Sequence, residues 1–387
     1  MRRLATLLAG LFLVVLLVVP LALCAQTPSS APRSLDLTEP GWKLSPEGAR
    51  VTEIGGKPSL VLESGSAERP DVSFQDGIIE LDVTTSARRS FVYVVFRIAG
   101  EAECEEFYLR PHKSNLSDAS QYAPVIQGAS QWQVFHGPGG TAPVALTPGA
   151  LTHVKVAFAG RRAALFVNDM TKPVLFVPRL AHEPRSGGIA FKAFIPKGSA
   201  GSGPSAVVSS IVVRPGAVDP ALSATVEDPK PVPGAIRSWM LSEALPEPVP
   251  AAVPALPSAR AFQKVAAEPN GLVLLHRHVR LAENARRATA AARVHLRAAK
   301  AGLRRLDLGF SDSATVFLNG TPLAFLDDGY SFDAPRRDGV VGFDQGTVFL
   351  PLVAGDNELV VVVSDVFGGW ALMGRFPDDS GLTVDAR

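Results

Sequence analysis

The chain has 387 residues, of which 47% are hydrophobic and 19% are charged, and its formal net charge is +1. A charge so close to neutral argues against a general nucleic-acid binder, which needs a strongly basic surface. The length is sufficient for two or three domains that each bury a core of their own.

The first 25 residues have the pattern of a secretory signal. Arg2 and Arg3 precede an uncharged apolar run that ends at the small residue Ala25. This order predicts a signal peptide over residues 1–25 and a secreted or periplasmic protein. Two alternatives stay open, because the run is long enough to remain as a membrane anchor, and because Cys24 ends LALC, which resembles a lipid-attachment box. We therefore expect membrane contact only if the segment is uncleaved or Cys24 is lipidated.

Residues 34–214 repeat short apolar or alternating runs that are separated by Gly, Pro, Ser and Asn. Regularly spaced short runs with turn residues between them are typical of a β-sandwich or barrel. No long segment has a convincing helical period. The runs that we expect to form strands include residues 77–85, 90–100, 152–160, 163–169 and 207–215.

The composition changes over residues 215–260, where proline recurs in PKPVPG and PEPVPAAVPALP. Proline holds the backbone extended and removes backbone donors, so we expect a semi-rigid linker between two separately folded domains. Within this linker, residues 235–245 (AIRSWMLSEAL) are expected either to form a short helix or to dock Trp239 onto a neighbouring domain. The second alternative is favoured because a solvated tryptophan would be unusual.

The β pattern resumes over residues 261–387, in runs such as ATVFLNGTPLAF and GTVFLPLVAGDNELVVVVSD. Asn319 and Gly320 lie between two apolar runs. Because both residues tolerate a positive φ, this dipeptide predicts a β-hairpin.

Two blocks of the sequence resemble known families. Residues 77–194, with DGIIELDV, FVYVVFRI, EEFYLRPH, an expected strand WQVFHG and LFVNDMTKPVLF, resemble the concanavalin A-like lectin/glucanase sandwich, including laminin G-like modules. Residues 306–376, with LDLGFSDSATVFLNG, LPLVAGDNELVVVVSD and FGGWALMGRF, are similar to a galactose-binding-like jelly roll of the kind appended to secreted glycosidases. The resemblances imply an all-β chain with two antiparallel β-sandwich domains, at 34–214 and 261–387. They leave the activity open, because these folds host lectins, adhesion modules, hydrolases and structural domains.

A glucanase of the sandwich class is expected to carry two glutamates and an aspartate on one strand face, in the pattern E-x-D-x-x-E. Glu80 and Asp82 share such a face in this chain, but Thr84 and Thr85 stand where the second glutamate belongs. A glycosidase needs a nucleophile and a separate acid. Hydrolysis is therefore disfavoured, and we assign no catalytic residue.

The stretch EEFYLRPHKS predicts a strand with a binding surface on one face. Tyr108, Arg110 and His112 lie on the same side of an extended strand, and Arg97 is expected to join them if the preceding strand is its neighbour. A sugar offers hydroxyl edges and apolar C–H faces, so fork-like donors beside an aromatic ring suit it. We expect Arg110 to be the central hydrogen-bond donor to the sugar and Tyr108 to be the aromatic platform beneath it. We expect His112 to lie at the edge of the site.

Gln121 and Tyr122, in the turn-rich stretch that follows, are predicted at the rim of this site. The candidate carbohydrate-binding residues are thus Arg97, Tyr108, Arg110, His112, Gln121 and Tyr122. A structural alternative stays open, in which the two arginines only cover an exposed sheet face or pair with an acidic run. That run consists of Glu101, Glu103, Glu105 and Glu106.

The sequence gives little indication of thiol, metal or cofactor chemistry. Acidic neighbours are expected to raise the pKa of the Cys104 thiol, which disfavours a nucleophilic role. His276 and His278 would share a strand face, but no third ligand lies at metal spacing, so we expect surface histidines. The pair Asp327-Asp328 leaves calcium open as an alternative, the metal ligands being unknown. No cofactor is implied, because nucleotide-binding and common hydrolase motifs are missing from the sequence.

The sequence therefore predicts a secreted or periplasmic, non-catalytic carbohydrate-binding protein whose partner is a polysaccharide or glycoside and not a nucleic acid. Two alternatives stay open. One is a glycoside hydrolase whose acid and nucleophile the pattern does not reveal. The other is an envelope scaffold that binds protein.

Overall fold

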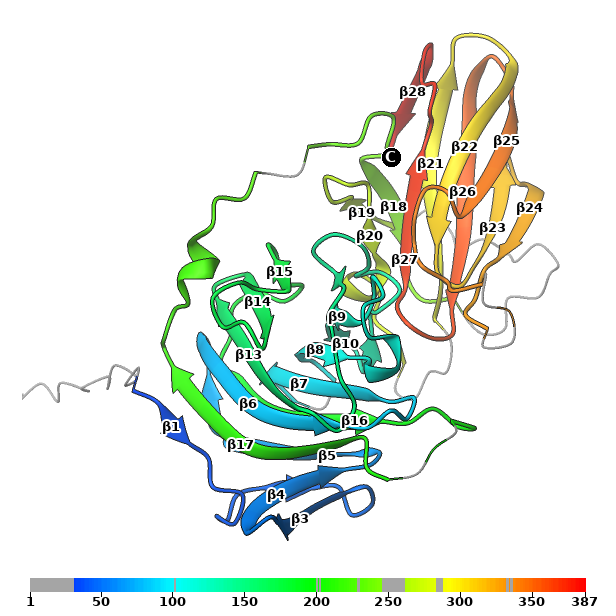
Figure 1. The fold of residues 1–387 in the computed structure, drawn as a ribbon. Coiled ribbons are helices and arrows are strands. Elements are labelled where there is room, and N and C mark those ends of the chain that lie inside the picture. Colours follow the sequence, from blue (N-terminus) through cyan, green and yellow to red (C-terminus); the bar gives the residue numbers. More distant parts are fainter. Residues whose placement is uncertain are drawn as a thin grey trace, which may run out of the picture.

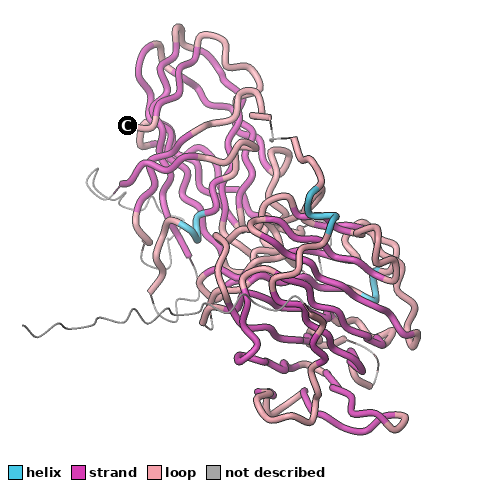
Figure 2. Tube along the Cα trace, turned by 90° about the vertical axis from the view of Figure 1, so that its left-hand side faces the viewer, coloured by secondary structure: helices cyan, strands magenta, loops and turns pink. Residues whose placement is uncertain are grey.

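The computed structural model describes residues 31–100, 102–199, 201, 203–227, 230–245, 262–282, 288–331, 334 and 337–387. The predicted signal peptide lies outside this part of the chain. Among the described residues, no helix is long and apolar enough to cross a membrane. The described chain is all-β, as predicted, with only short 3-10 turns such as η1 (Pro111–Lys113), η2 (Pro220–Ser223) and η4 (Leu275–Arg277) between its strands (Figures 1 and 2).

The first sandwich is built from two antiparallel sheets. Sheet 1 has the strand order β15 (Leu175–Val177), β14 (Arg162–Val167), β13 (Leu151–Ala159), β6 (Gly77–Thr85), β17 (Ala206–Pro215), β4 (Lys57–Leu62) and β3 (Ala49–Ile54), with β1 (Arg33–Ser34) also pairing β17. Sheet 2 has the order β12 (Thr141–Ala142), β9 (Ser120–Tyr122), β8 (Glu105–Leu109), β7 (Phe91–Ile98), β16 (Gly187–Phe194), β5 (Gly65–Phe74) and β2 (Lys43–Leu44). A short ribbon of β10 (Val125–Ile126) and β11 (Ala129–Ser130) lies beside them.

The second sandwich also has two antiparallel sheets. Sheet 3 has the order β19 (Phe262–Ala266), β18 (Ser238–Ser242), β21 (Ala288–Ala298), β26 (Gly355–Asp365), β23 (Ser313–Leu318) and β24 (Thr321–Asp327), with β28 (Leu382–Asp385) pairing β21. Sheet 4 has the order β20 (Val273–Leu274), β27 (Ala371–Arg375), β22 (Gly302–Phe310) and β25 (Gly346–Leu352). The predicted Asn319-Gly320 hairpin connects β23 to β24, and both residues have positive φ.

Period-two patterning explains how the strands form these layers. In β6, Ile79, Leu81 and Val83 point into the core of the first sandwich, whereas Glu80 and Asp82 point away from it. Alternate side chains of a strand lie on opposite faces, so this pattern selects one buried face per strand. The strands predicted near 77–85, 90–100, 152–160, 163–169 and 207–215 are confirmed as β6, β7, β13, β14 and β17.

The stretch predicted as a linker contains part of the second sandwich. Residues 238–242 form β18, which pairs with β19 and β21. Trp239 is fully buried in the core of this sandwich, so its expected burial is confirmed and the helix alternative is wrong. The residue is buried as part of a strand of the sandwich, which neither alternative anticipated. Residues 246–261 lie outside the described part of the chain, and the boundaries of the linker stay a prediction.

The two sandwiches touch through apolar side chains. Leu272, Leu274, Ala371 and Met373, from β20, β27 and the residue just before β20, belong to the same buried cluster as the core of the first sandwich. In Figure 1 the region of β8 to β10 accordingly lies beside β20 and β27. Burial of apolar surface thus favours a fixed arrangement of the two halves.

Glutamine side chains contribute several polar contacts to this junction. Gln127 donates from Nε2 to the carbonyls of His276 (2.6 Å) and Val279 (2.9 Å). The imidazole Nδ1 of His276 lies 3.2 Å from Oε1 of Gln131. The predicted surface position of His276 is wrong, because residues 275–277 form η4 and the side chain is buried between the sandwiches.

The expected strand WQVFHG is also wrong. Residues 132–135 form a turn, in which the backbone N–H groups of Val134 and Phe135 both donate to the carbonyl of Gln131 at 3.1 Å. Its apolar residues pack in two directions, because Trp132 contacts Phe367 of the second sandwich and Phe135 contacts Tyr122 in the core of the first. We call residues 131–135 the junction turn.

Glu105 is a buried acid in the core of the first sandwich. Its carboxylate accepts hydrogen bonds from the Tyr122 hydroxyl (2.6 Å) and from the backbone N–H of His182 (3.1 Å). Burial raises the pKa of Glu105 to about 7, although these two hydrogen bonds and the charge of Arg97 act in the opposite direction. The folded protein therefore retains a proton that the unfolded chain has already released.

This retained proton predicts a pH dependence of stability. Between about pH 4.5 and about pH 7 the folded state binds more protons at Glu105 than the unfolded state, so the contribution of Glu105 to the free energy of unfolding falls as pH rises through this window. Buried histidines with lowered pKa values, such as His112 and His276, contribute with the opposite sign, so the quantity to compare is the difference between the wild type and Glu105→Gln. Glu105→Gln should remove the Glu105 contribution, which amounts to roughly 3 kcal/mol or less. Urea unfolding of both proteins at the two ends of the window measures the difference.

Glu63→Gln is the matched control, because Glu63 is an exposed partner of Arg50. This variant should follow the wild type at both pH values. A wild type whose stability changes in parallel with Glu105→Gln would show that Glu105 titrates at its ordinary pKa.

Candidate functional site

The candidate site lies on the face of sheet 2 that points away from the core. β7 and β8 are neighbours, as the hypothesis of a shared surface requires, with Tyr93 directly opposite Tyr108. The row continues to Gln121 on β9 and, in the other direction, to Lys192 on β16. Side chains opposite one another on adjacent strands lie close enough to interact, so these four form one continuous row.

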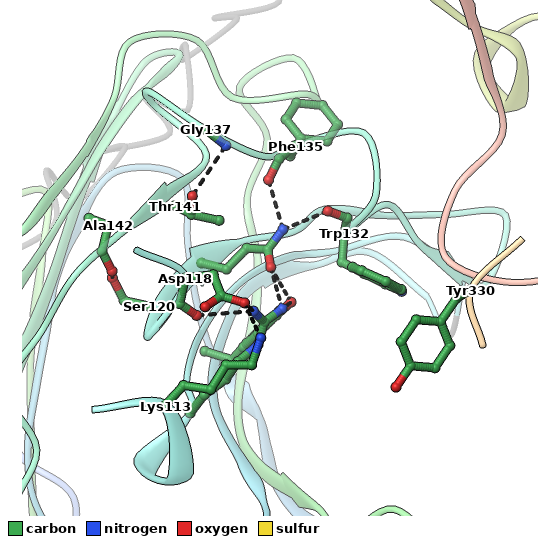
Figure 3. A network of polar contacts seen from close by, with 12 residues as sticks. Lys113, Asp118, Ser120, Trp132, Phe135, Gly137, Thr141, Ala142 and Tyr330 are labelled. Atoms are coloured by element: carbon green, nitrogen blue, oxygen red, sulfur yellow. Dashed lines mark hydrogen bonds and ion pairs between the residues drawn. The ribbon is translucent and has the colours of Figure 1, made fainter. Parts of the chain in front are cut away.

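The amide of Gln121 is the centre of a buried hydrogen-bond network. Its Oε1 accepts from the hydroxyl of Tyr108 and from the guanidinium of Arg110, both at 2.6 Å. Its Nε2 donates to the backbone carbonyls of Trp132 (2.6 Å) and Phe135 (2.8 Å) in the junction turn. Figure 3 shows these two carbonyl oxygens directed at the network. An amide has two donors and two acceptor sites, so Gln121 is saturated.

Arg110 joins this network to an ion pair. It donates to the Tyr108 hydroxyl at 2.7 Å and to the carboxylate of Asp118, which Lys113 also contacts. Figure 3 shows Asp118 and Lys113 at this end of the network. Burial raises the pKa of the Tyr108 phenol, so the hydroxyl stays protonated and can donate to Gln121. Since Arg110 is only 5% exposed, its bonded donors point at other protein groups.

A second set of side chains forms the accessible layer of the same face. Phe91, Tyr93, Lys192 and Phe194 line the surface, and Phe91 lies opposite Phe194 across the strand pair, with ring centroids 6.0 Å apart. An open hollow of about 320 Å³ is lined by Ser64, Gly65, Ser66, Tyr93, Lys192, Ala193 and Phe194. We use "accessible layer" for Phe91, Tyr93, Lys192 and Phe194.

Lys192 is held in place within the accessible layer. Its ammonium lies 2.8 Å from the buried carboxylate of Glu106 and 4.2 Å above the ring of Tyr93. An ion pair and a cation–π contact together fix a side chain that would otherwise be mobile. The head group is partly exposed, so a positive donor is presented at the hollow.

The buried network supports this layer from beneath. The ring of Tyr108 contacts that of Tyr93 at 5.0 Å and that of Phe91 at 5.8 Å. Arg110 lies 5.6 Å from the ring of Phe91. The predicted platform and the predicted central donor thus position the exposed rings, and their direct contact with a ligand stays a prediction.

Arg97 and Tyr122 do not join the others. The guanidinium of Arg97 is buried on the core side of sheet 2, where it contacts the Gly160 carbonyl (2.7 Å) and the ring of Phe158 (5.3 Å). A β-bulge near the end of β7 and a φ of 52° at Arg97 break the alternation on which the expected position depended. Tyr122 also lies in the core, because it follows Gln121 by one residue and points the opposite way.

His112 lies at the edge of the site, as expected. Its ring contacts Phe91 edge to face at 5.5 Å. Burial lowers the pKa of His112 to about 4, and the nearby charges of Arg89, Arg110 and Lys113 act in the same direction. The imidazole is therefore neutral at physiological pH and adds no charge to this surface.

Neither arginine forms an ion pair with Glu103, Glu105 or Glu106, the described members of the glutamate run; Glu101 lies outside the described residues. Arg97 pairs with Asp76 and Arg110 with Asp118, whereas Glu106 pairs with Lys192. Sequence proximity favoured the wrong partners because the true ones come from turns that the strand pattern does not place.

Glu80 and Asp82 lie on the outer face of sheet 1, across the core from the candidate site. The imidazole of His153 is 2.6 Å from Asp82 and 3.5 Å from Glu80. Arg214 lies 3.1 Å from the other oxygen of Glu80. Both carboxylates are thus engaged by cationic or hydrogen-bonding neighbours, and they cannot belong to one site with the accessible layer.

Metal and thiol chemistry gain no support from the geometry. No group of three or more His, Cys, Asp or Glu side chains that could hold a metal occurs among the described residues. Burial raises the pKa of the Cys104 thiol to about 12, and the charge of Glu106 adds to this effect. Cys104 therefore stays protonated, in the direction that the acidic neighbours predicted.

The sequence interpretation missed Lys192 and Phe194. Both belong to the run GGIAFKAF, in which Ile189, Phe191 and Ala193 point into the core and the alternate positions point outward. Period two alone could have placed them on the outer face. Their position beside Tyr93 depends on the pairing of β16 with β7, strands that are about 90 residues apart, and the sequence pattern does not specify this pairing.

The buried position of Arg110 predicts a stability effect. Arg110→Ala removes two hydrogen bonds from the network and one of the two cations at Asp118, so the free energy of unfolding should fall by about 2 to 4 kcal/mol. Arg50→Ala, which breaks an exposed ion pair with Glu63, should change it by less than about 1 kcal/mol. Urea unfolding compares the two. Unchanged stability combined with lost ligand binding would instead assign Arg110 to the binding surface.

Comparisons with known proteins find structural similarity only. No protein-family model and no curated protein sequence matches the chain. Among solved structures, the chain is similar to the carbohydrate-binding module CBM66 from Bacillus subtilis, with 12% identity and a TM-score of 0.31 over 45% of this chain and 92% of that one. It is similar to a glycosidic hydrolase, with 13% identity and a TM-score of 0.38 over 50% and 100% of the two chains. It is also similar to the Bacillus licheniformis β-glucanase, with 10% identity and a TM-score of 0.37 over 49% and 99%.

Proposed function

We propose that this protein is an exported, non-catalytic carbohydrate-binding protein and that it binds sugar at the accessible layer of sheet 2. The observation that carries the proposal is the hollow in which the aromatic rings of Tyr93 and Phe194 lie beside the cationic head of Lys192. Export rests on the predicted signal peptide of residues 1–25.

The chemistry of the hollow suits a sugar ring. Aromatic faces accept the apolar C–H face of a pyranose, and a fixed ammonium donates to its hydroxyl groups. Ser64 and Ser66 add polar groups to the lining of the hollow. A charged ligand would be less well matched, because Lys192 is already neutralised by Glu106.

The buried network gives this surface its rigidity. Tyr93 and Phe91 are held from below by Tyr108 and Arg110, which are themselves fixed by Gln121. A surface that is ordered before binding loses little conformational entropy when the ligand arrives. Preorganisation of this kind makes useful affinity attainable from a shallow site.

A glycan array on the mature protein tests binding, and Phe194→Ala tests the site. Phe194 is exposed and contributes a ring to the hollow, so its removal should weaken the strongest glycan ligand by about 5-fold, the value of a lost ring contact of about 1 kcal/mol. Isothermal titration calorimetry with that glycan measures the change.

Phe325→Ala is the matched control, because Phe325 is another exposed phenylalanine but lies on β24 of the second sandwich. It should bind as the wild type does. Equal losses in both variants, or none in Phe194→Ala, would remove the accessible layer from the binding site.

The hydrolase alternative has one structural locus, the cluster of Glu80, Asp82 and His153. We expect no detectable hydrolysis of β-glucans or galactans, because both carboxylates are paired and the third carboxylate of the glucanase pattern is replaced by threonine. Reducing-sugar release after prolonged incubation measures this. Turnover that disappears in Glu80→Gln would establish the enzyme instead.

A further inference from the structure

The two sandwiches together form an exposed aromatic cluster beside the candidate site. Trp132 of the junction turn lies 5.6 Å from Tyr330 and 6.0 Å from Phe367, and the last two rings are 6.2 Å apart. Tyr330 and Phe367 belong to the second sandwich and are 41% and 58% exposed, respectively. Figure 3 shows Tyr330 coming from a separate segment of the chain to face Trp132. We call these three residues the junction cluster.

The junction cluster is built into the fold on both sides. The carbonyl of Trp132 accepts from Gln121, and the next residue, Gln133, donates its backbone N–H to the carbonyl of Gly368 at 2.9 Å. Gly368 has a φ of 100°, and a Cβ there would lie 2.6 Å from the indole Nε1 of Trp132. The turn that carries Phe367 is therefore shaped to receive the indole ring, and only glycine fits it.

The second sandwich also holds the side chain of Gln133. Its Nε2 donates to the carbonyl of Asp338 (3.1 Å) and lies 3.3 Å from the carboxylate of Asp312. Its Oε1 accepts from the hydroxyl of Ser311 at 3.0 Å. Because Gln133 is fully buried and these bonds satisfy its amide, Trp132 is presented at a fixed position.

Side-chain contacts and one short stretch of chain connect the accessible layer to the junction cluster. Phe194 contacts Phe91, and Arg89, two residues before Phe91, donates to the Tyr330 hydroxyl at 3.2 Å. Tyr330 in turn contacts Trp132. Rings alternate with polar or cationic groups along this path, which is the composition that a sugar chain requires at successive units.

We propose that the junction cluster is a second carbohydrate subsite and that the protein therefore binds an extended oligosaccharide across both sandwiches. This inference rests on the proposed function of the accessible layer. The second sandwich is then part of the binding site, since Tyr330 and Phe367 come from it. A contiguous patch of exposed apolar side chains marks a ligand surface more often than a single exposed apolar residue does.

Phe367→Ala tests the subsite in the full chain. The ligands are cello-, laminari-, xylo- and galacto-oligosaccharides of increasing length, from monosaccharides to hexasaccharides. The wild type should bind longer chains more tightly. Phe367→Ala should weaken the longest chains by about 5-fold and leave the mono- and disaccharides unchanged, whereas Phe194→Ala should weaken every length.

Phe349→Ala is the control, because Phe349 lies in the second sandwich on β25 and is 60% exposed, slightly more than Phe367 at 58%. It should leave binding of every length unchanged. Tyr330→Ala provides a second variant with the same expected length dependence, so that the test does not depend on the folding of one protein.

The outcomes separate this inference from the proposed function. If Phe194→Ala weakens the hexasaccharides but Phe367→Ala and Tyr330→Ala do not, the subsite is overturned and the accessible layer stands. If the wild type binds no oligosaccharide of any length and no glycan on the array, both are overturned.

Discussion

The amide of Gln121 is the contact on which the rest of the structure depends. It fixes the hydroxyl of Tyr108 and the guanidinium of Arg110 on one side and the carbonyls of Trp132 and Phe135 on the other. One side chain thus connects the face of sheet 2 to the junction turn. A buried amide with an unpaired donor or acceptor would be costly, so this connection allows little variation in geometry.

The junction turn connects the fixed hydrogen-bond geometry of Gln121 to the second sandwich. Gln131 and Gln133 flank Trp132, and they bond to His276 and to the Ser311–Asp312 region, respectively. Apolar contacts of Leu274 and Met373 with the first core complete the interface. The polar contacts set the register of the two halves, and the apolar contacts supply the favourable free energy.

Much of the fold could be predicted from the sequence, and the predictions that failed have identifiable causes. Period two located the strands of the first sandwich, because each strand buries one face. Arg97 was misplaced because a β-bulge reverses its direction, and no residue in FVYVVFRI signals that bulge. WQVFHG was misread as a strand because its apolar residues pack in two different directions, Trp132 against Phe367 of the second sandwich and Phe135 against Tyr122 in the first core.

The candidate site was predicted in part for the same reasons. Tyr108 and Arg110 lie on one side of sheet 2, as strand spacing predicted. His112 reaches the same side from η1, because the strand ends at Leu109, and Gln121 is buried on β9, so its predicted position at the rim is wrong. Local spacing could not show which of these side chains are buried. It also could not show which side chains from distant strands, such as Lys192, form the exposed surface that covers them. Those facts depend on long-range strand pairing, which the pattern of a single strand does not encode.

The shared junction also determines how such a chain can be inherited. A domain that is transferred between proteins must fold alone, so all of its surface must be polar enough to be exposed to water. The first sandwich separated from the second would lose the rings that pack against Trp132 and the apolar side chains, such as Leu274, that belong to its core cluster, and Gln133 would lose its partners. The prolines of residues 215–260 suggest a domain boundary at which genes could recombine. Fragments separated there would nevertheless expose apolar surface and leave polar groups without hydrogen-bond partners. The two sandwiches are expected to have diverged together, as a single unit of selection, and not as exchangeable parts.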